Sequence, residues 1–148
     1  MNDSAQLSVR PLDELDISSV VAIDEKVSGS YRPDFWERRI TYHLRKDPEG
    51  SFVAEWEGGV IGFMLGEIRT GEFGLEEPTG WIEIVGVDPD HRGKRVGRDL
   101  AEAVFAHFRR QGVATVRTLV DEKRAELGSF FGSLGFEPST LRPFVKAL

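Results

Sequence analysis

The stretch Gly80-Trp81-Ile82-Glu83-Ile84-Val85-Gly86-Val87, followed by Asp88-Pro89, decides the fold of this chain. Its apolar residues run almost without interruption, which is the pattern of a strand that is buried on both faces of a sheet. Proline cannot donate a hydrogen bond to a neighbouring strand, so we expect the strand to end at Asp88-Pro89. The sequence therefore predicts a central strand over residues 80–87.

A long amphipathic helix is predicted over residues 96–110. Its apolar side chains recur at spacings of one, three and four and form one stripe, namely Leu100, Ala101, Val104, Phe105 and Phe108. Gly112 follows this stripe, at a place where glycine commonly ends a helix. A buried strand, a short turn and a helix are thus expected in direct succession.

The other elements follow from local periodicity and from turn residues. Two apolar runs flank Glu57-Gly58-Gly59, and a Gly-Gly turn in this position is typical of a β-hairpin. Helical spacing and alternation predict the remaining helices and strands. The expected strands lie at 7–10, 51–56, 60–69, 113–120 and within 136–148, and the expected helices at 13–27, 34–44 and 127–134.

The predicted order of elements is β-α-α-β-β-β-α-β-α-β, which describes an α/β or α+β layered domain with about four helices beside the sheet. The 148 residues contain no repeat, low-complexity tract or linker. A chain of this length fits one domain, so we expect a single domain over residues 1–148. Hydrophobic residues make up 40% of the sequence and charged residues 30%, a balance typical of a globular protein.

Composition excludes several classes of function. The chain has no cysteine, which excludes disulfides, thiolate catalysis and cysteine-ligated zinc. Its net charge of −6 disfavours nonspecific binding to nucleic acid or to an anionic membrane. The N-terminus does not read as a secretion signal, and the apolar stretches fall far short of the roughly 20 residues that span a bilayer. We therefore expect a cytoplasmic protein that binds neither nucleic acid nor membrane.

The turn between the predicted central strand and the long helix is basic in an otherwise acidic protein. It carries four cations, Arg92, Lys94, Arg95 and Arg98, together with Gly93 and Gly97. Glycines allow a close approach of the backbone to a ligand, and the helix behind them offers free N–H groups and a positive dipole end. This combination predicts a site for a phosphate or a pyrophosphate. A solvated turn whose cations pair with neighbouring aspartates is the alternative.

Other nucleotide, hydrolase and metal sites find no support. The sequence has neither a Gly-x-x-x-x-Gly-Lys-[Ser/Thr] run nor a Gly-x-Gly-x-x-Gly run after a strand. A Gly-x-Ser-x-Gly nucleophile elbow is absent as well. The three histidines, His43, His91 and His107, are scattered, so we expect no metal site.

Residues 84–97, Ile-Val-Gly-Val-Asp-Pro-Asp-His-Arg-Gly-Lys-Arg-Val-Gly, resemble motif A of the GCN5-related N-acetyltransferases (GNAT). That motif is a strand ending in Val-x-Pro, then [Arg/Gln]-x-x-Gly-x-[Gly/Ala] at the start of a helix. Arg92 and Gly97 fill its outer places, whereas Arg95 stands where the family has its middle glycine. Residues 130–136, Phe-Phe-Gly-Ser-Leu-Gly-Phe, are similar to the family's second signature. The resemblance implies a GNAT-like mixed central sheet.

The resemblance also implies acetyl-CoA as co-substrate. Its pyrophosphate would lie on the backbone N–H groups of residues 92–97, and its pantetheine arm would pair with the backbone of Val85 and Val87. Arginine matches phosphate geometry well, so we expect Arg95 to point outward and supply a cation there, and a steric clash with the phosphates is the alternative. The cofactor-binding residues that this implies are Val85, Gly86, Val87, Arg92, Gly93, Lys94, Arg95, Val96, Gly97, Arg98 and Phe131.

Glu83 is the candidate base for removing a proton from the attacking amine. It is a charged residue inside an apolar strand, where a carboxylate is costly unless it is paired or functional, and many family members carry a catalytic glutamate at this position. Alternation places it on the face of Trp81, Val85 and Val87. Its ordinary pKa of about 4.3 suits a base only after desolvation or through a water. A structural salt bridge is the alternative.

For the other catalytic groups, the resemblance implies donors for the oxyanion but no tyrosine as general acid. Backbone N–H groups of residues 85–87 would stabilise the oxyanion. Phe131 stands where family members often have a tyrosine that acts as general acid, but a thiolate leaves tolerably without help because a thiol titrates near about 8.5. We expect an N-acetyltransferase acting on a small-molecule amine or on a protein or peptide amine. A non-catalytic acetyl-CoA-binding module is the alternative, and a homodimer stays open.

Overall fold

The computed structural model describes residues 6–148, which divide into two compact units. The first unit ends at Thr118, and the second comprises Leu119–Leu148. All strands and three of the four α-helices of the described residues belong to the first unit. The single domain expected over residues 1–148 stays a prediction.

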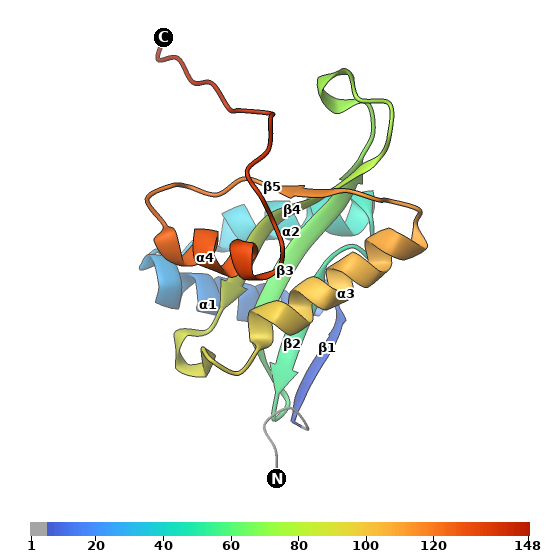
Figure 1. The fold of residues 1–148 in the computed structure, drawn as a ribbon. Coiled ribbons are helices and arrows are strands. Elements are labelled where there is room, and N and C mark those ends of the chain that lie inside the picture. The colour runs from blue at the N-terminus through green and yellow to red at the C-terminus, as the bar shows by residue number, and fades with distance from the viewer. Residues whose placement is uncertain (1–5) are drawn as a thin grey trace. The chain divides into compact units, whose positions relative to one another are not determined.

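One five-stranded sheet forms the centre of the first unit (Figure 1). Its strands lie in chain order, with three antiparallel pairs followed by a parallel pair, so the sheet is mixed as the resemblance implied. The strands are β1 (Leu7–Pro11), β2 (Phe52–Trp56), β3 (Gly59–Arg69), β4 (Thr79–Val87) and β5 (Val116–Thr118).

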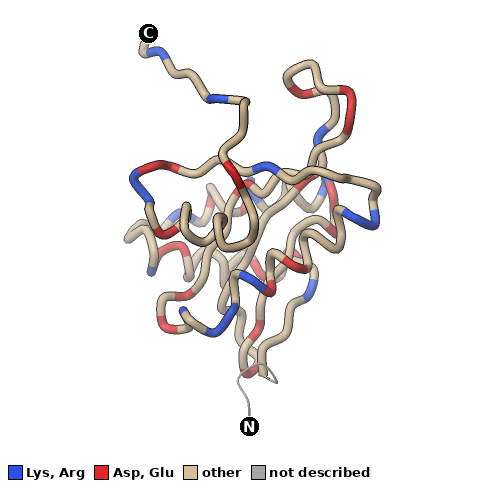
Figure 2. The backbone as a smooth tube through the Cα atoms, viewed as in Figure 1, with Lys and Arg blue, Asp and Glu red and all other residues tan. Residues whose placement is uncertain are grey.

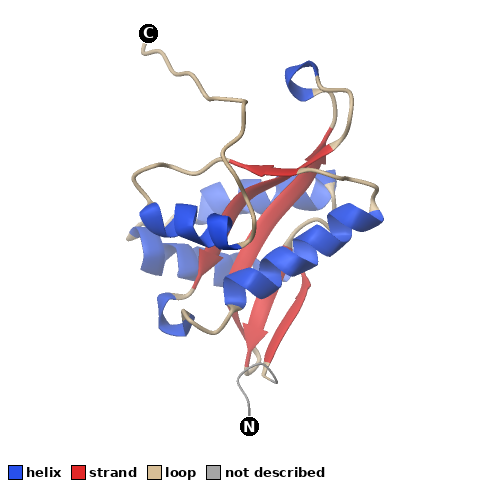
Figure 3. Cartoon of the chain, viewed as in Figure 1, coloured by secondary structure: helices blue, strands red, loops and turns tan. Residues whose placement is uncertain are grey.

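Helices cover both faces of this sheet (Figure 3). In the first unit, α1 and α2 pack on one face, and α3 packs on the other. The second unit contains α4. The α-helices are α1 (Ile17–Ser28), α2 (Pro33–Lys46), α3 (Val96–Arg110) and α4 (Ala125–Ser133). None of the helices within residues 6–148 combines the length and the apolar composition needed to cross a bilayer.

A hydrophobic core fixes α1 and α2 to the sheet. Val20 and Ile40 are fully buried there, and the Trp36 ring meets the Phe63 ring edge to face, with centroids 5.2 Å apart. Full burial of such side chains contributes about 1.5–3 kcal/mol each. The position of α2 over β3 and β4 therefore follows from the apolar stripe on its inner face.

A β-bulge interrupts the pairing of β3 with β4. Leu65 lies opposite Ile84 and Gly66 lies opposite Ile82, so Glu83 is an extra residue on β4. A bulge of this kind shifts the alternation of the strand by one residue. Ile84 consequently packs against the core beneath α1 and α2, on the same face as Glu83.

The expected alternation along β4 is wrong beyond this bulge. A Cβ added to Gly86 would meet the Phe63 ring on the α1–α2 face, so Val85 and Val87 lie on the α3 face and not on the face of Glu83. Continuous burial of the strand is also wrong, because residues 79–82 are buried whereas residues 83–87 are half-buried.

Most predicted elements are confirmed with small shifts, but two strands differ. The strand expected at 113–120 shortens to Val116–Thr118, where its pairing with β4 stops. The strand expected within 136–148 is wrong, since no described residue of that segment is in a strand. Pro138 and Pro143 lack the N–H that a ladder needs, and residues 137–148 are exposed.

The close packing of α3 on β4 predicts that a single methyl group at Gly80 destabilises the protein. A Cβ there would lie 2.5 Å from the Phe108 ring, which is buried. Overpacking of this kind costs about 1–3 kcal/mol, so Gly80→Ala should lower the free energy of unfolding in urea by that amount. Gly59→Ala is the matched control, because its Cβ meets only the Trp56 carbonyl oxygen at 3.7 Å. Equal stability of the two variants would contradict the packing.

Candidate active site

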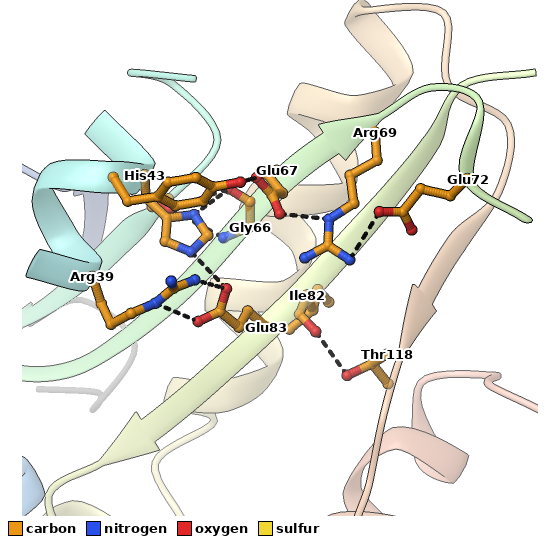
Figure 4. Close-up of polar contacts among 11 residues, drawn as sticks. Arg39, His43, Gly66, Glu67, Arg69, Glu72, Ile82, Glu83 and Thr118 are labelled. Carbon is orange, nitrogen blue, oxygen red and sulfur yellow. Dashed lines mark hydrogen bonds and ion pairs between the residues drawn. The ribbon is translucent and has the colours of Figure 1, made fainter. Parts of the chain in front are cut away.

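Glu83 is held by two side chains of α2 (Figure 4). Its Oε1 accepts a hydrogen bond from Arg39 Nε at 2.9 Å. Its Oε2 accepts from Arg39 Nη2 and contacts His43 Nε2 at 3.1 Å. The Glu83 side chain is 22% exposed, so the carboxylate retains access to solvent.

The local sequence of α2 explains the position of these two side chains. Pro33 occupies the first position of the helix, where its missing N–H costs nothing, and Asp34 stands in the first turn. Trp36, Ile40 and His43 follow at helical spacing and are all buried. His43 therefore lies on the face that packs against the sheet.

The surroundings of Glu83 lower its pKa. Burial alone raises the pKa of the carboxyl, but the contacts with His43 and Arg39 outweigh burial and bring the pKa to about 2. The raised pKa that direct proton abstraction requires is thus not found. The salt bridge that the sequence left open is present, and the role of Glu83 as a base stays a prediction.

A second polar cluster lies beside Glu83 on the same face of the sheet. Glu67 is fully buried and accepts hydrogen bonds from Tyr42 Oη at 2.6 Å and from Arg69 Nε at 2.5 Å. Arg69 also pairs with Glu72 at 3.4 Å. The hydrogen bond to Glu67 raises the pKa of Tyr42, so this tyrosine is a poor proton donor.

Strands β4 and β5 pair over three residues and then part. The parallel pairing ends at Ile82 and Thr118, and Thr118 Oγ1 donates to the Ile82 carbonyl oxygen at 2.9 Å. Within the described part of the chain, β3 is the one strand that pairs with residues 83–87. The backbone of Val85 and Val87 thus has an edge without a strand partner, at the place where pantetheine was predicted to bind.

The predicted phosphate loop is a turn with two residues in the left-handed region. Asp88 caps a short 3₁₀ helix (Pro89–His91), with its Oδ1 accepting from the Asp90 N–H at 3.0 Å. Gly93 has φ 84° and Arg95 has φ 66° before α3 begins at Val96. The side chain of Arg95, which precedes the helix, does not cap its first turn, so this side chain leaves the first N–H groups of α3 available to an anion.

Among the described ion pairs, Asp88 and Asp90 take a cation from outside the loop rather than Arg92, Lys94 or Arg95. Asp88 and Asp90 both pair with Lys26 of α1, at 3.0 and 3.3 Å. The Lys94 ammonium lies 4.4 Å from the centroid of the Trp56 ring. Arg92 and Arg95 are exposed and form no ion pair within residues 6–148. Figure 2 shows this basic segment before α3.

Phe131 belongs to the second unit and is described there by itself. It lies on α4, and its ring meets those of Phe130 and Phe136 edge to face, at 5.0 and 5.2 Å. Glu83, residues 85–87 and residues 92–98 all belong to the first unit, on β4, the turn after it and the start of α3. The contact of Phe131 with a cofactor stays a prediction.

Sequence reasoning missed Arg39 and His43. One signal could have found His43, since it continues the buried stripe of Trp36 and Ile40 with a polar side chain that needs a buried partner. Arg39 carries no such signal, because an arginine on a helix is usually solvated. Within the described residues, no group of three or more His, Cys, Asp or Glu side chains could hold a metal ion.

Residues 17–136 match the model of the acetyltransferase (GNAT) family. The chain belongs to this family. The match runs through the bulged strand, the basic turn and the helix that follows, and it includes the second signature around Phe131. The resemblance proposed from residues 84–97 and 130–136 is thereby confirmed.

Relatives and solved structures are consistent with this assignment. The mycothiol acetyltransferase of Thermobispora bispora is 39% identical over 90 residues, which are 61% of this chain and 30% of that protein. The mycothiol acetyltransferase of Acidothermus cellulolyticus is 33% identical over 122 residues, which are 76% of this chain and 37% of that protein. The chain thus spans about a third of the length of these curated relatives.

Two solved structures share the GNAT fold. Aminoglycoside N-acetyltransferase AAC(6')-Iy in complex with CoA superposes with a TM-score of 0.81 at 20% identity, covering 95% of this chain and 94% of that one. Ard1 from Thermoplasma volcanium superposes with a TM-score of 0.77 at 25% identity, covering 91% and 85%. The layered α/β architecture predicted from the sequence is confirmed.

The low pKa of Glu83 predicts a pH-dependent contribution to stability. Because the folded pKa of about 2 lies below the ordinary 4.5, the contribution is fully present above pH 4.5 and is lost as the pH falls towards 2. Each pKa unit corresponds to about 1.4 kcal/mol, and solvent screening of this partly exposed carboxylate reduces the contribution to about 2–3 kcal/mol. Glu83→Gln should therefore flatten the fall in unfolding free energy over this range. Glu102→Gln on the exposed face of α3 is the control and should keep the wild-type slope.

The left-handed backbone at Arg95 predicts that glycine fits this position better than alanine. A side chain in this region costs about 1–2 kcal/mol, partly offset by the greater chain entropy of unfolded glycine. Arg95→Gly should exceed Arg95→Ala in unfolding free energy by about 1 kcal/mol, and both variants lose the same charge. Chemical denaturation of the pair measures this, and a more stable alanine variant would refute the left-handed conformation.

Proposed function

We propose that the chain is an acetyl-CoA-dependent N-acetyltransferase that moves an acetyl group from the thioester to a primary amine by direct attack. The observation that carries the proposal is the arrangement of β4. This strand contains a glutamate at a bulge and then a backbone edge without a β5 partner. A basic turn follows the strand, and the side chain of its last residue does not cap α3. A solved GNAT structure of the same fold contains CoA, which supports the choice of co-substrate.

The co-substrate binds along β4 and the turn that follows it. Its pyrophosphate lies on the N–H groups of residues 92–97, where left-handed residues and the start of α3 favour an anion. The exposed guanidinium of Arg95 offers a planar fork that suits phosphate oxygens. The pantetheine amides pair with Val85 and Val87 beside Gly86, as a short added strand would.

The reaction needs one bond to form and one to break. The amine nitrogen attacks the thioester carbonyl carbon, and the oxyanion accepts hydrogen bonds from backbone N–H groups of residues 85–87. Such donors contribute about 3–4 kcal/mol each. The tetrahedral intermediate then collapses, the C–S bond breaks and CoA leaves as thiolate. Since a thiol titrates near about 8.5, the thiolate does not require the acid that Phe131 cannot supply.

Glu83 assists the loss of the attacking amine's proton by acting through a water. Its pKa of about 2 makes it too weak a base to keep that proton at neutral pH. An ionised carboxylate nevertheless attracts the ammonium form of the acceptor and orients the water that takes its proton. The proton then passes to solvent, to which the partly exposed carboxylate has access.

The acceptor is a small-molecule primary amine. The names of the relatives support this class, since they are mycothiol acetyltransferases and an aminoglycoside acetyltransferase. A protein or peptide amine is the second candidate for the acceptor. A non-catalytic acetyl-CoA-binding module is the second candidate function, and the phenylalanine at position 131 and the arginine at position 95 favour it.

Thiol release on a panel of acceptors tests the proposed function. We expect acetyl-CoA to raise the melting temperature, because a ligand at 100 times its Kd stabilises a protein by about 2.7 kcal/mol. We expect free CoA to appear with at least one small amine, and Glu83→Gln to lower turnover while the Kd for acetyl-CoA stays unchanged. Glu102→Gln serves as control.

The other outcomes separate the candidates. Thermal stabilisation without release of CoA on amines and peptides alike would favour the binding module. Turnover only with peptide amines would replace the acceptor class and keep the activity. Neither stabilisation nor release would overturn the proposed function.

A further inference from the structure

We propose that Arg39 and His43 of α2 are positioning residues of the acetyl transfer, which hold the Glu83 carboxylate so that one acceptor position on Oε1 is left for the attacking amine or its water. This inference rests on the proposed function. It assigns to α2 a part in the reaction besides its packing on the sheet.

Counting hydrogen bonds on the carboxylate leads to this assignment. An ionised carboxylate accepts about four hydrogen bonds, two on each oxygen. Arg39 Nη2 and His43 Nε2 occupy Oε2, and Arg39 Nε occupies one position on Oε1. One position on Oε1 remains, and the side chain that carries it is partly exposed.

His43 is locked in place on both sides. Its ring is completely buried, with Nε2 on Glu83 and Nδ1 3.1 Å from the Gly66 carbonyl oxygen. Both partners are oxygens that accept hydrogen bonds, so the ring is held at both of its nitrogens. An apolar side chain would continue the stripe of α2 without the cost of burying a polar ring. The ring therefore fixes the direction of the carboxylate relative to β3.

Arg39 holds the same carboxylate through two N–H donors of its planar guanidinium group. Its guanidinium meets both oxygens of Glu83 and lies 4.8 Å from the centroid of the Tyr42 ring. Paired contacts of this kind give directional specificity as well as attraction. Lysine offers a single point charge instead and does not reproduce the fork.

The bulge makes these side-chain contacts necessary. Glu83 is the extra residue of β4, so it has no paired residue on β3 that would fix its orientation. The neighbouring charges do not take over this role, because Glu67 and Arg69 of β3 pair with each other, and Arg69 further pairs with Glu72. The described ion pairs of Glu83 thus come from α2 alone.

Steady-state kinetics of α2 variants tests the inference. Misplacement of a reacting group by about 1 Å can cost about 100-fold in rate. We therefore expect Arg39→Met and His43→Leu to lower kcat about 10- to 100-fold, with the KM for acetyl-CoA unchanged. His43→Gln, which keeps an N–H donor, should recover part of this loss, and Arg39→Lys should lie between wild type and Arg39→Met.

Arg32→Met is the matched control. Arg32 also forms a two-point contact on one carboxylate, Asp24, and also lies over an aromatic ring, that of Phe35 at 4.7 Å. It stands at the N-terminal end of the same helix, away from Glu83. The control should lose comparable stability and keep the wild-type kcat.

A titration of the Glu83 carboxyl carbon by NMR gives a readout that is independent of turnover. The pKa should rise in Arg39→Met and in His43→Leu, because each loses a group that holds the carboxylate ionised, and it should stay unchanged in Arg32→Met. Wild-type kcat in folded Arg39→Met and His43→Leu would overturn the inference alone. Absence of turnover in the wild type would overturn the proposed function and this inference with it.

Discussion

The extra residue in β4 is the constraint on which the rest of the site depends. Without the bulge, regular alternation would put Ile84 on the α3 face and Val85 beneath α2. With it, Glu83 and Ile84 both face α2, and Val85 and Val87 turn to the other side. One strand thereby presents a carboxylate on one face and, at its edge, a backbone stretch that β5 leaves unpaired. A half-buried carboxylate in such a place is tolerated only with partners, and α2 supplies them.

The short pairing of β4 with β5 also shapes the site, because it leaves part of the β4 backbone without a strand partner. Parallel strands that continued side by side would satisfy the backbone of residues 83–87 and leave nothing for a ligand to pair with. The pairing stops at Ile82, and in the turn that follows β4 the described ion pairs of Asp88 and Asp90 with a lysine do not involve Arg92 or Arg95. Lys26 takes those aspartates instead, which ties the turn to α1. In the proposed reaction, backbone groups thus bind the anion and a side chain faces the acceptor.

Local signals were enough to predict most of this fold, but not the geometry of its site. The helix over 96–110 was predicted with its observed bounds, because its apolar stripe and the glycine beyond it are local features. The bulge could not be predicted, because Ile82-Glu83-Ile84 alternates like any regular strand and only the register with β3 reveals the extra residue. The pairing of Arg39 with Glu83 joins residues 44 positions apart and depends on the packing of α2. The prediction of a strand within 136–148 was wrong, because a strand also needs a neighbouring strand to pair with. The periodicity of a sequence does not show whether such a partner exists.

A carboxylate with a pKa of about 2 and a phenylalanine in place of a proton donor lead to the same view of the proposed reaction. Neither group stores or delivers a proton at neutral pH. The proton of the amine therefore passes through water to solvent, and the sulfur leaves as the anion that it readily forms. What remains for the protein is to hold the ammonium, to orient the water and to stabilise the oxyanion, which are tasks of position and charge. A carboxylate kept ionised by a guanidinium and an imidazole suits these tasks better than one whose charge changes near neutral pH.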